Sequence, residues 1–574
     1  MIEKLKNLRG SLYRKLAKKP VSAKELAKEK TRASQMIEIL RPSVQPEKEE
    51  VKKKIKIGKG KIKYPEFTVS PTKRLLILPS EIPKYFRYPL IEPYAYAVIR
   101  TDILKNTTTY NIIEPLLNEQ EQYILSKIKQ GLIQTISVSL TAVRHEKELM
   151  NFLEENVQNL LNEYGFCLTP EQYLKIMYYL YRDFVGLNEI EPIMHDPYIE
   201  DLGVDGINIP IYVLHQRFGS LKTNIVYKNI EELREFVVKL AERCDRYISY
   251  AEPLLDGTLP DGTRVQATLA QDVTTKGPTF SIRKFREEPF TPTDMISLKT
   301  ASAELLAYLW YAIEARSNLL ICGGTGTGKT SFLNTISLFV PVESKIVSIE
   351  DTRELSLPHE HWIPGVVRTG FTGTKVGEVT MFDLLKESFR QNPDYLIVGE
   401  VRGEEAYVMF QGMASGHPSF STIHAASLDD VIKRLESPPI GLSPSLIETL
   451  DLVIIMVHAR EYGKSARRVK EVMEIQNVDK ETGKVNAIKS FSWVPVNDQI
   501  EYKGYSWLLN EISSKKGISI TEIQREISQR KMVLNWMAER KLKNLKDITK
   551  YIAMYQRDKN KLLKMISEES ASSS

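Results

Sequence analysis

The chain has 574 residues, of which 42% are hydrophobic and 26% charged, and this length and composition are typical of a folded protein of two to four domains. Its 3 cysteines, Cys167, Cys244 and Cys322, form no C-x-x-C pair, which excludes a disulfide framework and a cysteine zinc site and indicates a reducing compartment. A charged start and the lack of any run of 18 uncharged apolar residues predict neither a secretory signal nor a membrane span.

The net charge of +6 is unevenly distributed. Residues 1–63 hold 20 Lys and Arg against 7 Asp and Glu, a net charge of +13, whereas the remainder carries −7. A solvated tail, contact with anionic lipid headgroups or a partner, and non-specific nucleic-acid contact are the alternatives. Lipid or partner contact is favoured over nucleic acid, because Tyr13 is the only aromatic residue before Tyr64 that could stack on bases.

Three regions are expected in the first half of the chain. Residues 1–75 read as a basic, partly disordered extension, and apolar residues at helical spacing between 119 and 161 predict a largely helical N-terminal subdomain over 76–180. From 181 to 290, short apolar runs broken by turn dipeptides predict an α+β domain. The proline-marked segment 289–294 is expected to be a hinge into the next domain.

The next region, 291–505, alternates between helices and short apolar strands. Strands are expected at 318–322, 345–350, 395–398, 419–423 and 452–458. Strands that alternate with helices predict a parallel sheet covered on both faces, with ligands bound at the carboxyl ends of the strands. The remaining residues, 506–574, are predicted to form helices only.

A glycine-rich segment after the first of these strands carries the strongest chemical signal. Residues 323–330 read GGTGTGKT, a complete phosphate loop in which backbone N–H groups and a helix N-terminus bind phosphate oxygens. Lys329 is expected to reach the β- and γ-phosphates of ATP, and the Thr330 hydroxyl to hold Mg²⁺. The predicted nucleotide-binding residues are Gly323, Gly324, Thr325, Gly326, Thr327, Gly328, Lys329 and Thr330.

Acidic residues follow two later strands. Residues 348–355 read SIEDTREL, and a carboxylate on a strand adjacent to the phosphate-loop strand could orient or deprotonate the attacking water. A polar turn with solvated charges is the alternative. Residues 392–402 read NPDYLIVGEVR, in which the strand delivers Glu400 to the same edge of the sheet as a second acidic, Mg²⁺-organising residue.

Two of the 8 histidines flank the strand at 419–423. A lone histidine is more often a structural residue than a functional one. His424, however, follows the strand at the place where a sensor of the γ-phosphate would lie. This position favours a nucleotide-sensing role for His424, and favours it less for His417.

Taken together, GGTGTGKT, IEDTREL, NPDYLIVGEVRG and GHPSFSTIHA resemble the motifs of the type II and type IV secretion ATPase superfamily, which includes type IV pilus, conjugation and archaellum motors. The resemblance runs from about residue 181 to 496. The archaeal branch is the most similar, because EDTRE replaces the EDPxE of bacterial pilus motors, a cysteine zinc motif is absent, and R-x-V-K-E-V-M-E-I from Arg467 and the helical end are archaeal in style.

The resemblance implies an α/β fold with a RecA-like phosphate-loop ATPase core over 291–505. A PAS-like α+β domain precedes the core, a helical, basic extension lies N-terminal to that, and a helical region follows. Within the core, the resemblance makes Glu354 the catalytic carboxylate, with Glu350 and Asp351 in support. It also makes Glu400 the Walker B glutamate, a Mg²⁺ ligand together with Thr330, and His424 the histidine-box residue.

Two arginines of the α+β domain match family segments. LPDGTR ends at Arg264, and FSIRKF contains Arg283. The resemblance makes both candidate arginine fingers, because a guanidinium offers a planar, permanently charged donor fork to phosphate. Surface arginines on a turn and an edge strand are the alternative. Which acidic-box glutamate is the base, and whether the arginines act in cis or in trans, stay open at this point.

The resemblance implies a cytoplasmic homohexamer, peripherally associated with the cytoplasmic membrane, that hydrolyses ATP with Mg²⁺. It would dock on a polytopic membrane platform protein and power assembly of a pilus-like filament, and its basic N-terminus could contact an anionic membrane surface. A conjugation-type DNA export ATPase is the alternative, although the acidic balance of residues 64–574 makes nucleic acid an unexpected partner. A module that binds ATP without hydrolysis is disfavoured by the intact carboxylates. The filament, and assembly versus retraction, stay open.

Overall fold

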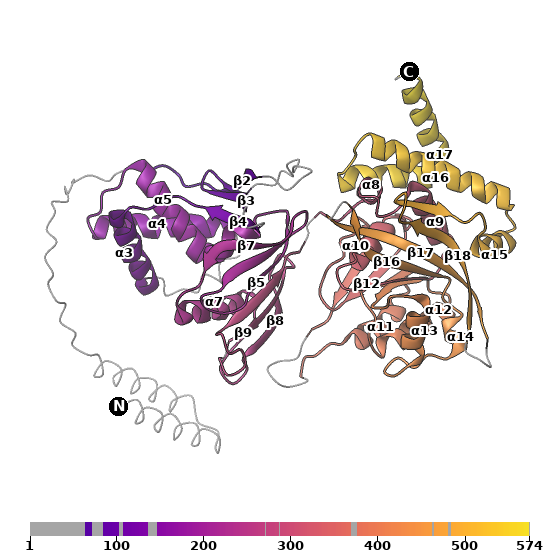
Figure 1. Ribbon diagram of the computed structural model, residues 1–574, viewed down its shortest axis with the longest axis horizontal. Helices are drawn as coiled ribbons and strands as arrows, with labels where there is room; N and C mark the ends of the chain where they lie inside the picture. Colours follow the sequence, from indigo (N-terminus) through magenta and orange to yellow (C-terminus); the bar gives the residue numbers. More distant parts are fainter. Residues whose placement is uncertain are drawn as a thin grey trace, which may run out of the picture. The chain divides into compact units, whose positions relative to one another are not determined.

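The structure is a computed structural model (Figure 1). It describes residues 64–71, 84–102, 107–135, 146–269, 271–285, 288–368, 376–461, 464–479 and 484–572. The predicted basic extension lies almost entirely outside the described residues. Apart from Gly165–Cys167, the described residues belong to one compact unit.

The first sheet has ten strands in the order β1-β2-β3-β4-β7-β6-β5-β10-β9-β8. All neighbouring pairs are antiparallel except β4 with β7. Burial alternates along strands such as β8 and β10, which indicates one packed face and one solvated face. The bounds are β1 Ser70–Pro71, β2 Tyr85–Glu92, β3 Ala95–Asp102, β4 Thr107–Ile113, β5 Ile199–Val204, β6 Pro210–His215, β7 Gly219–Val226, β8 Leu254–Thr258, β9 Arg264–Thr268 and β10 Thr279–Arg283.

The helices of this part are α3 Glu119–Thr135, α4 Glu146–Glu163, α5 Pro170–Leu180, α6 Glu191–Met194 and α7 Ile230–Arg243, with a π-helix at Tyr181–Val185 and a 3-10 helix at Asn188–Ile190. Helix α7 packs on the sheet through Phe236, whose ring centroid lies 5.2 Å from that of Phe280 in β10. The expectation of a largely helical region over 76–180 is wrong for β2, β3 and β4. These strands form consecutive antiparallel pairs, and β4 joins the rest of the sheet through its parallel pairing with β7, a tertiary contact that local propensity does not predict.

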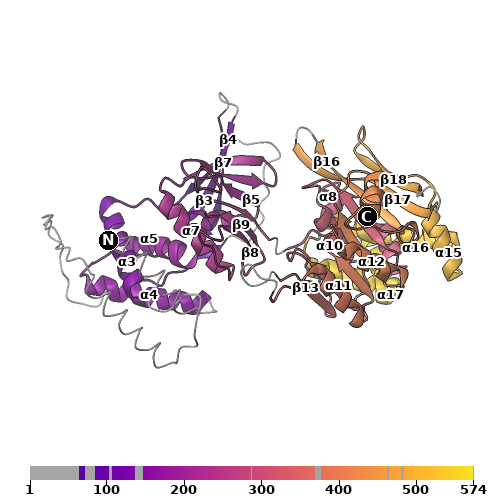
Figure 2. The same ribbon diagram turned by 90° about the horizontal axis from the view of Figure 1, so that it is seen from below.

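The second sheet has nine strands in the order β13-β12-β14-β15-β11-β16-β17-β18-β19. The first six are parallel, and β16 to β19 are paired antiparallel; β16, β17 and β18 lie side by side in both ribbon views (Figures 1 and 2). The bounds are β11 Leu319–Gly323, β12 Ile346–Glu350, β13 Trp362–Val366, β14 Tyr395–Val398, β15 Ser419–Ile423, β16 Leu452–Glu461, β17 Lys464–Val478, β18 Val485–Val494 and β19 Gln499–Tyr502.

This order confirms the predicted α/β fold class with a RecA-like core, and the five strands expected in that core are present as β11, β12, β14, β15 and β16. One expectation is wrong. The strand that carries SIEDTREL, β12, is not adjacent to the phosphate-loop strand β11, because β14 and β15 lie between them. The neighbours of β11 are β15 and β16.

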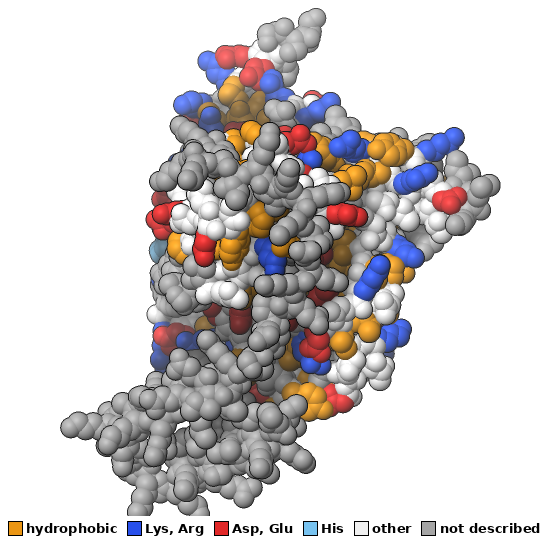
Figure 3. Space-filling model, turned by 90° about the vertical axis from the view of Figure 1, so that its left-hand side faces the viewer, with side chains coloured by type: hydrophobic (Ala, Val, Ile, Leu, Met, Phe, Trp, Pro, Cys, Tyr) orange, Lys and Arg blue, Asp and Glu red, His pale blue; other side chains and the backbone are white. Residues whose placement is uncertain are grey.

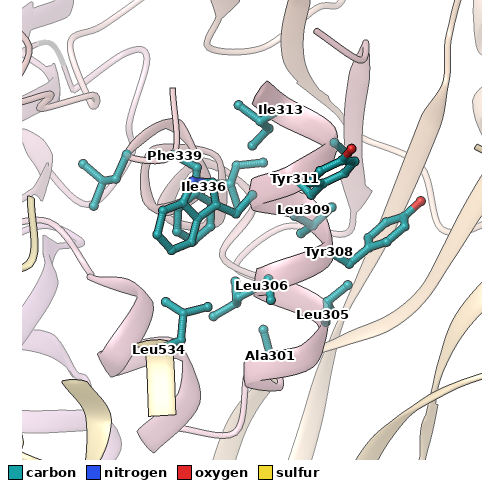
Figure 4. Packing of buried hydrophobic residues seen from close by; sticks show 14 of the residues in the cluster. Ala301, Leu305, Leu306, Tyr308, Leu309, Tyr311, Ile313, Ile336, Phe339 and Leu534 are labelled. Atoms are coloured by element: carbon teal, nitrogen blue, oxygen red, sulfur yellow. The ribbon is translucent and has the colours of Figure 1, made fainter. Parts of the chain in front are cut away.

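Successive residues of β11 pack alternately into two hydrophobic cores, one on each face of the sheet. Leu319 and Ile321 belong to one core and Leu320 and Cys322 to the other, as the two-residue period of a strand requires. Figure 4 shows the first core, where side chains of α9 pack against Ile336 and Phe339. The helices are α8 Pro292–Ser297, α9 Ala303–Glu314, α10 Lys329–Ser337, α11 Met381–Arg390, α12 Glu405–Ala414, α13 Leu428–Glu436 and α14 Pro444–Ile447.

Three further helices follow β19: α15 Trp507–Lys516, α16 Ile520–Glu539 and α17 Leu545–Ser572. Arg530 of α16 is 5% exposed. Its guanidinium pairs with Glu314 of α9 and lies 3.2 Å from Glu526, and it stacks over Trp310 and Tyr555. This buried cation ties α16 and α17 to α9. Among the described residues, no helix is long and apolar enough to cross a lipid bilayer.

Replacement of Arg530 by Ala is expected to loosen this attachment. Removing one partner of a buried ion pair leaves the other charge uncompensated, at a cost of about 3 kcal/mol. The thermal midpoint should fall and proteolysis within 507–572 should accelerate. Arg525, exposed on the same helix, provides the matched control, and Arg525→Ala should change neither. Equal behaviour of the two variants would contradict the attachment.

Candidate nucleotide-binding site

The loop from Gly323 to Lys329 joins β11 to α10, and its glycines are needed for two different reasons. Gly326 and Gly328 have φ angles of +73° and +88°, which residues with a side chain rarely adopt. A Cβ at Gly323 would lie 2.6 Å from the Met456 carbonyl oxygen. The curled backbone is held by the Thr327 hydroxyl, which donates to the Gly324 carbonyl at 2.9 Å.

The backbone of this loop fits an anionic ligand. Within the described part of the chain, the N–H groups from Gly324 to Gly328 donate to no acceptor. They precede the N-terminus of α10, whose dipole attracts negative charge. The side chain of Thr330 lies half-buried in the first turn of that helix, where its hydroxyl could serve as a hard oxygen ligand for Mg²⁺.

Lys329, His424 and Glu400 form a linked chain beside the loop. The Lys329 ammonium lies 3.0 Å from the Gly324 carbonyl oxygen and 3.4 Å from His424 Nδ1, and His424 Nε2 lies 3.3 Å from Glu400. Burial and the Lys329 charge lower the pKa of His424, which favours the neutral imidazole, and a neutral ring can accept from the Lys329 ammonium at Nδ1. Burial also lowers the pKa of Lys329, while the Glu400 charge opposes that effect.

Glu400 is placed by hydrogen bonds between the ends of β14 and β15. The Thr422 hydroxyl donates to the Gly399 carbonyl at 2.8 Å, and the Val401 N–H donates to the Thr422 carbonyl at 2.9 Å. Burial alone would raise the pKa of Glu400, but a 2.7 Å hydrogen bond from Arg402 and the nearby positive charges lower it. An ionised carboxylate at this edge is suited to bind Mg²⁺.

The two glutamates of SIEDTREL have different environments. Glu350 is 1% exposed, and its Oε1 accepts the backbone N–H groups of Glu354 and Leu355 at 2.8 and 2.9 Å. Glu354 is exposed, and its charge raises the pKa of Lys329 against the larger effect of burial. The exposed carboxylate therefore lies within electrostatic range of the loop lysine.

Strands β9 and β10 place the two predicted arginines side by side. Arg283 is directly opposite Arg264 in the antiparallel register, so both project from the same face of the sheet. Arg264 pairs with Asp256 at 3.1 Å and lies 3.8 Å from Asp351 of the acidic turn, and Asp201 faces Arg283 on the other side. The structure brings the arginines together, and their catalytic role stays a prediction.

Arg467 of β17 is a loop contact that the sequence analysis missed. Its Nε donates to the Gly326 carbonyl at 3.0 Å, and its guanidinium pairs with Glu200 at 3.1 Å. Lys329 is therefore not the only cation at the loop. The position follows from the pairing of β17 with β16, the neighbour of β11, and the motif spacing carries no signal of that pairing.

His417 lies apart from this group. It precedes β15, at the end of the strand opposite His424, and its ring packs edge-on against Phe389 with centroids 5.3 Å apart. Its N–H donates to the Gly412 carbonyl. These contacts give His417 a structural place under α12, in line with the weaker expectation for it.

Comparisons with known proteins show the family to which the chain belongs. Residues 213–510 match the sequence model of the family described as type II/IV secretion system protein. An uncharacterised protein of Methanocaldococcus jannaschii is 36% identical over 507 residues, which cover 84% of this chain and 90% of the relative. The type IV secretion system protein PtlH of Bordetella pertussis is 31% identical over 274 residues, covering 42% of this chain and 79% of PtlH.

Among solved structures, the VirB11 ATPase of the Brucella suis type IV secretion system is 22% identical, with 50% of this chain and 92% of that chain covered and a TM-score of 0.26. The family match begins within β6 and ends within α15. It includes the glycine loop and every residue of the linked chain beside it. The segment that holds β1 to β4 and α3 to α5 lies outside it.

Glu350→Gln is expected to remove a pH-dependent part of the stability. Burial raises the pKa of Glu350 from 4.5 to about 7, so between these values the folded protein holds a proton that the unfolded chain has released. The contribution is complete below the unfolded pKa and is lost as the pH rises through 7, by roughly 3 kcal/mol.

Thermal midpoints of the parent and the variant, measured from about pH 5 to about pH 8, test this expectation. The parent should lose stability relative to Glu350→Gln across that interval. The exposed Glu360 supplies the control, because Glu360→Gln should track the parent. Parallel curves for the parent and Glu350→Gln would show that Glu350 ionises normally.

Proposed function

Because the chain belongs to the type II/IV secretion system protein family, we propose that it is an ATPase that converts ATP and water to ADP and phosphate and drives a secretion-like machine. The observation that carries the proposal is the linked chain of Lys329, His424 and Glu400 beside a loop whose amides donate to no acceptor among the residues that the structure describes. Three groups that can respond to a terminal phosphate meet at one edge of the sheet.

In this proposal, the residues divide the work of phosphoryl transfer. The loop amides and Lys329 bind the phosphates, while Thr330 and Glu400 would hold Mg²⁺, which supplies positive charge for the transferring group when bound. Glu354 accepts the proton of the attacking water. We assign detection of the γ-phosphate to His424, because its ring lies 3.4 Å from the Lys329 ammonium and 3.3 Å from Glu400.

Arg264 and Arg283 complete the proposed site. Their side-by-side placement on β9 and β10 offers two guanidinium groups to one phosphate, which suits the charge that develops during transfer. Arg264 already lies 3.8 Å from Asp351 in the acidic turn. Loss of the γ-phosphate would remove an attraction between the strands and the loop, and this change is how hydrolysis would produce motion.

We further propose, from the family resemblance, a homohexamer that acts at the cytoplasmic face of a membrane through a polytopic platform protein. It would power assembly of a pilus-like filament of the archaeal pilus or archaellum kind. The 36% identity to a Methanocaldococcus jannaschii protein over 84% of this chain supports the archaeal branch.

Lys329→Ala is expected to reduce phosphate release by at least about 100-fold, because a preorganised charge that faces the transferring group is lost. Release of inorganic phosphate from Mg-ATP by the full chain is the measurement. Lys433 lies exposed on α13, and Lys433→Ala should retain the parent rate. A parent protein without phosphate release, or a fully active Lys329→Ala variant, would overturn the proposed activity.

A DNA export or translocase ATPase is the second candidate. On the face shown in Figure 3, the described surface carries Asp and Glu as well as Lys and Arg side chains, and residues 64–574 carry a net charge of −7. A DNA channel requires a concentration of positive charge. We therefore favour the filament motor.

We expect neither single- nor double-stranded DNA to raise the rate of phosphate release. Any salt-dependent DNA binding by the full chain should come from its basic residues 1–63. A variant lacking residues 1–63 should therefore show little salt-dependent DNA binding. Stimulation of turnover by DNA in that shortened variant would favour the export ATPase instead.

A further inference from the structure

Two glutamates of the turn after β12 could each serve as the base in the proposed hydrolysis. We propose that Glu350 is a positioning residue, whose side chain fixes the turn that presents Glu354, and that it does not itself accept the proton of the attacking water. The assignment rests on the proposed ATPase activity. It follows from hydrogen bonds and burial that separate the two carboxylates.

The Glu350 side chain, at the end of β12, is hydrogen-bonded to the backbone of the turn that follows it. One oxygen accepts two consecutive backbone N–H groups, from Glu354 at 2.8 Å and Leu355 at 2.9 Å. The backbone of the proposed base is therefore attached to the end of β12 through a side chain four residues earlier. Without that acceptor, two N–H groups of the turn would lose their partner, and the turn would lose its shape.

The far side of the turn is anchored to the helix of the phosphate loop. Leu355 is fully buried in the same core as α9 and α10, and the Ser356 N–H donates to the Asn334 side chain of α10 at 3.0 Å. Since α10 begins at Lys329, the acidic turn is held at a set distance from the loop. Glu350 supplies the remaining constraint, at the strand end.

The second oxygen of Glu350 is closed off from solvent. Oε2 is buried and has no hydrogen-bond partner among the described residues, and the side chain passes beneath Gly399, where a Cβ would lie only 3.2 Å from Glu350 Cγ. A general base must lie within hydrogen-bond reach of the proton it takes. Glu354 is exposed and can meet this condition, whereas Glu350 is enclosed between β12 and the end of β14.

To position the turn, Glu350 needs an acceptor oxygen and not a negative charge. Burial raises the pKa of Glu350 to about 7, so a large fraction is uncharged near neutral pH. Its neutral carbonyl oxygen can still accept both N–H groups. A glutamine has the same size and the same acceptor but cannot take up a proton, so substitution by Gln separates positioning from proton transfer.

The test compares three variants of the full chain in phosphate release at varied Mg-ATP. Glu350→Gln should keep kcat within about threefold of the parent. Glu350→Ala should lower kcat at least about tenfold, because a displaced catalytic group costs one to two orders of magnitude, with less than a threefold change in KM. Glu354→Gln should abolish turnover while ATP binding persists.

A matched control addresses general destabilisation. Glu474 of β17 is also fully buried and accepts three hydrogen bonds, from the Tyr308 and Ser506 hydroxyls and the Leu508 N–H. Glu474→Gln and Glu474→Ala should lower the thermal midpoint and leave kcat per folded molecule unchanged. A fall in kcat for Glu474→Ala equal to that for Glu350→Ala would assign the Glu350 effect to stability and overturn the proposal.

A second readout does not depend on activity. Backbone amide exchange at Glu354 and Leu355 should be slow in the parent and in Glu350→Gln, and at least about tenfold faster in Glu350→Ala. If the parent releases no phosphate, the proposed ATPase activity fails, while the exchange result still decides whether Glu350 holds the turn. Complete loss of turnover in Glu350→Gln would make Glu350 the base, and unchanged exchange in Glu350→Ala would remove its positioning role.

Discussion

The in-register parallel pairing of β14, β15 and β11 is the constraint on which the candidate site depends. Leu320 pairs with Ser421, and Val398, the last residue of β14, pairs with Ser421 from the other side. Since β15 ends two residues later, at Ile423, Glu400 lies at the level at which β15 ends. The backbone therefore places the glycine loop, His424 and Glu400 at the same edge of the sheet. The close distances among Lys329, His424 and Glu400 are a consequence of this register.

The rigidity of that edge comes from burial on both faces of the sheet. Every residue of β11, β12, β14 and β15 is buried, and separate cores occupy the two sides. A strand enclosed in this way cannot shift by one residue without moving its apolar side chains into the wrong core. The C-terminal helices strengthen one side, where Arg530 joins α16 to α9.

The sequence analysis could predict those parts of the site that are written in consecutive residues. The phosphate loop, Glu400 and His424 each directly follow a strand, and the bounds of β14 and β15 agree with the expected ranges. Strand order is different, because local sequence does not state which strands are neighbours. The expected position of β12 next to β11 was consequently wrong. Arg467 was missed because only the pairing of β17 with β16 brings it to the loop. The roles of Glu354 and the two arginines remain predictions.

Gly399 shows a demand on sequence that differs from that of the loop glycines. Its φ is not positive, so the φ angle at this position does not require glycine. The space above it, however, is already occupied by the Glu350 side chain. Because a Cβ at position 399 would lie 3.2 Å from Glu350 Cγ, any larger residue in the VGE segment requires the glutamate side chain of the neighbouring strand to shift, and with it the oxygen that holds the acidic turn.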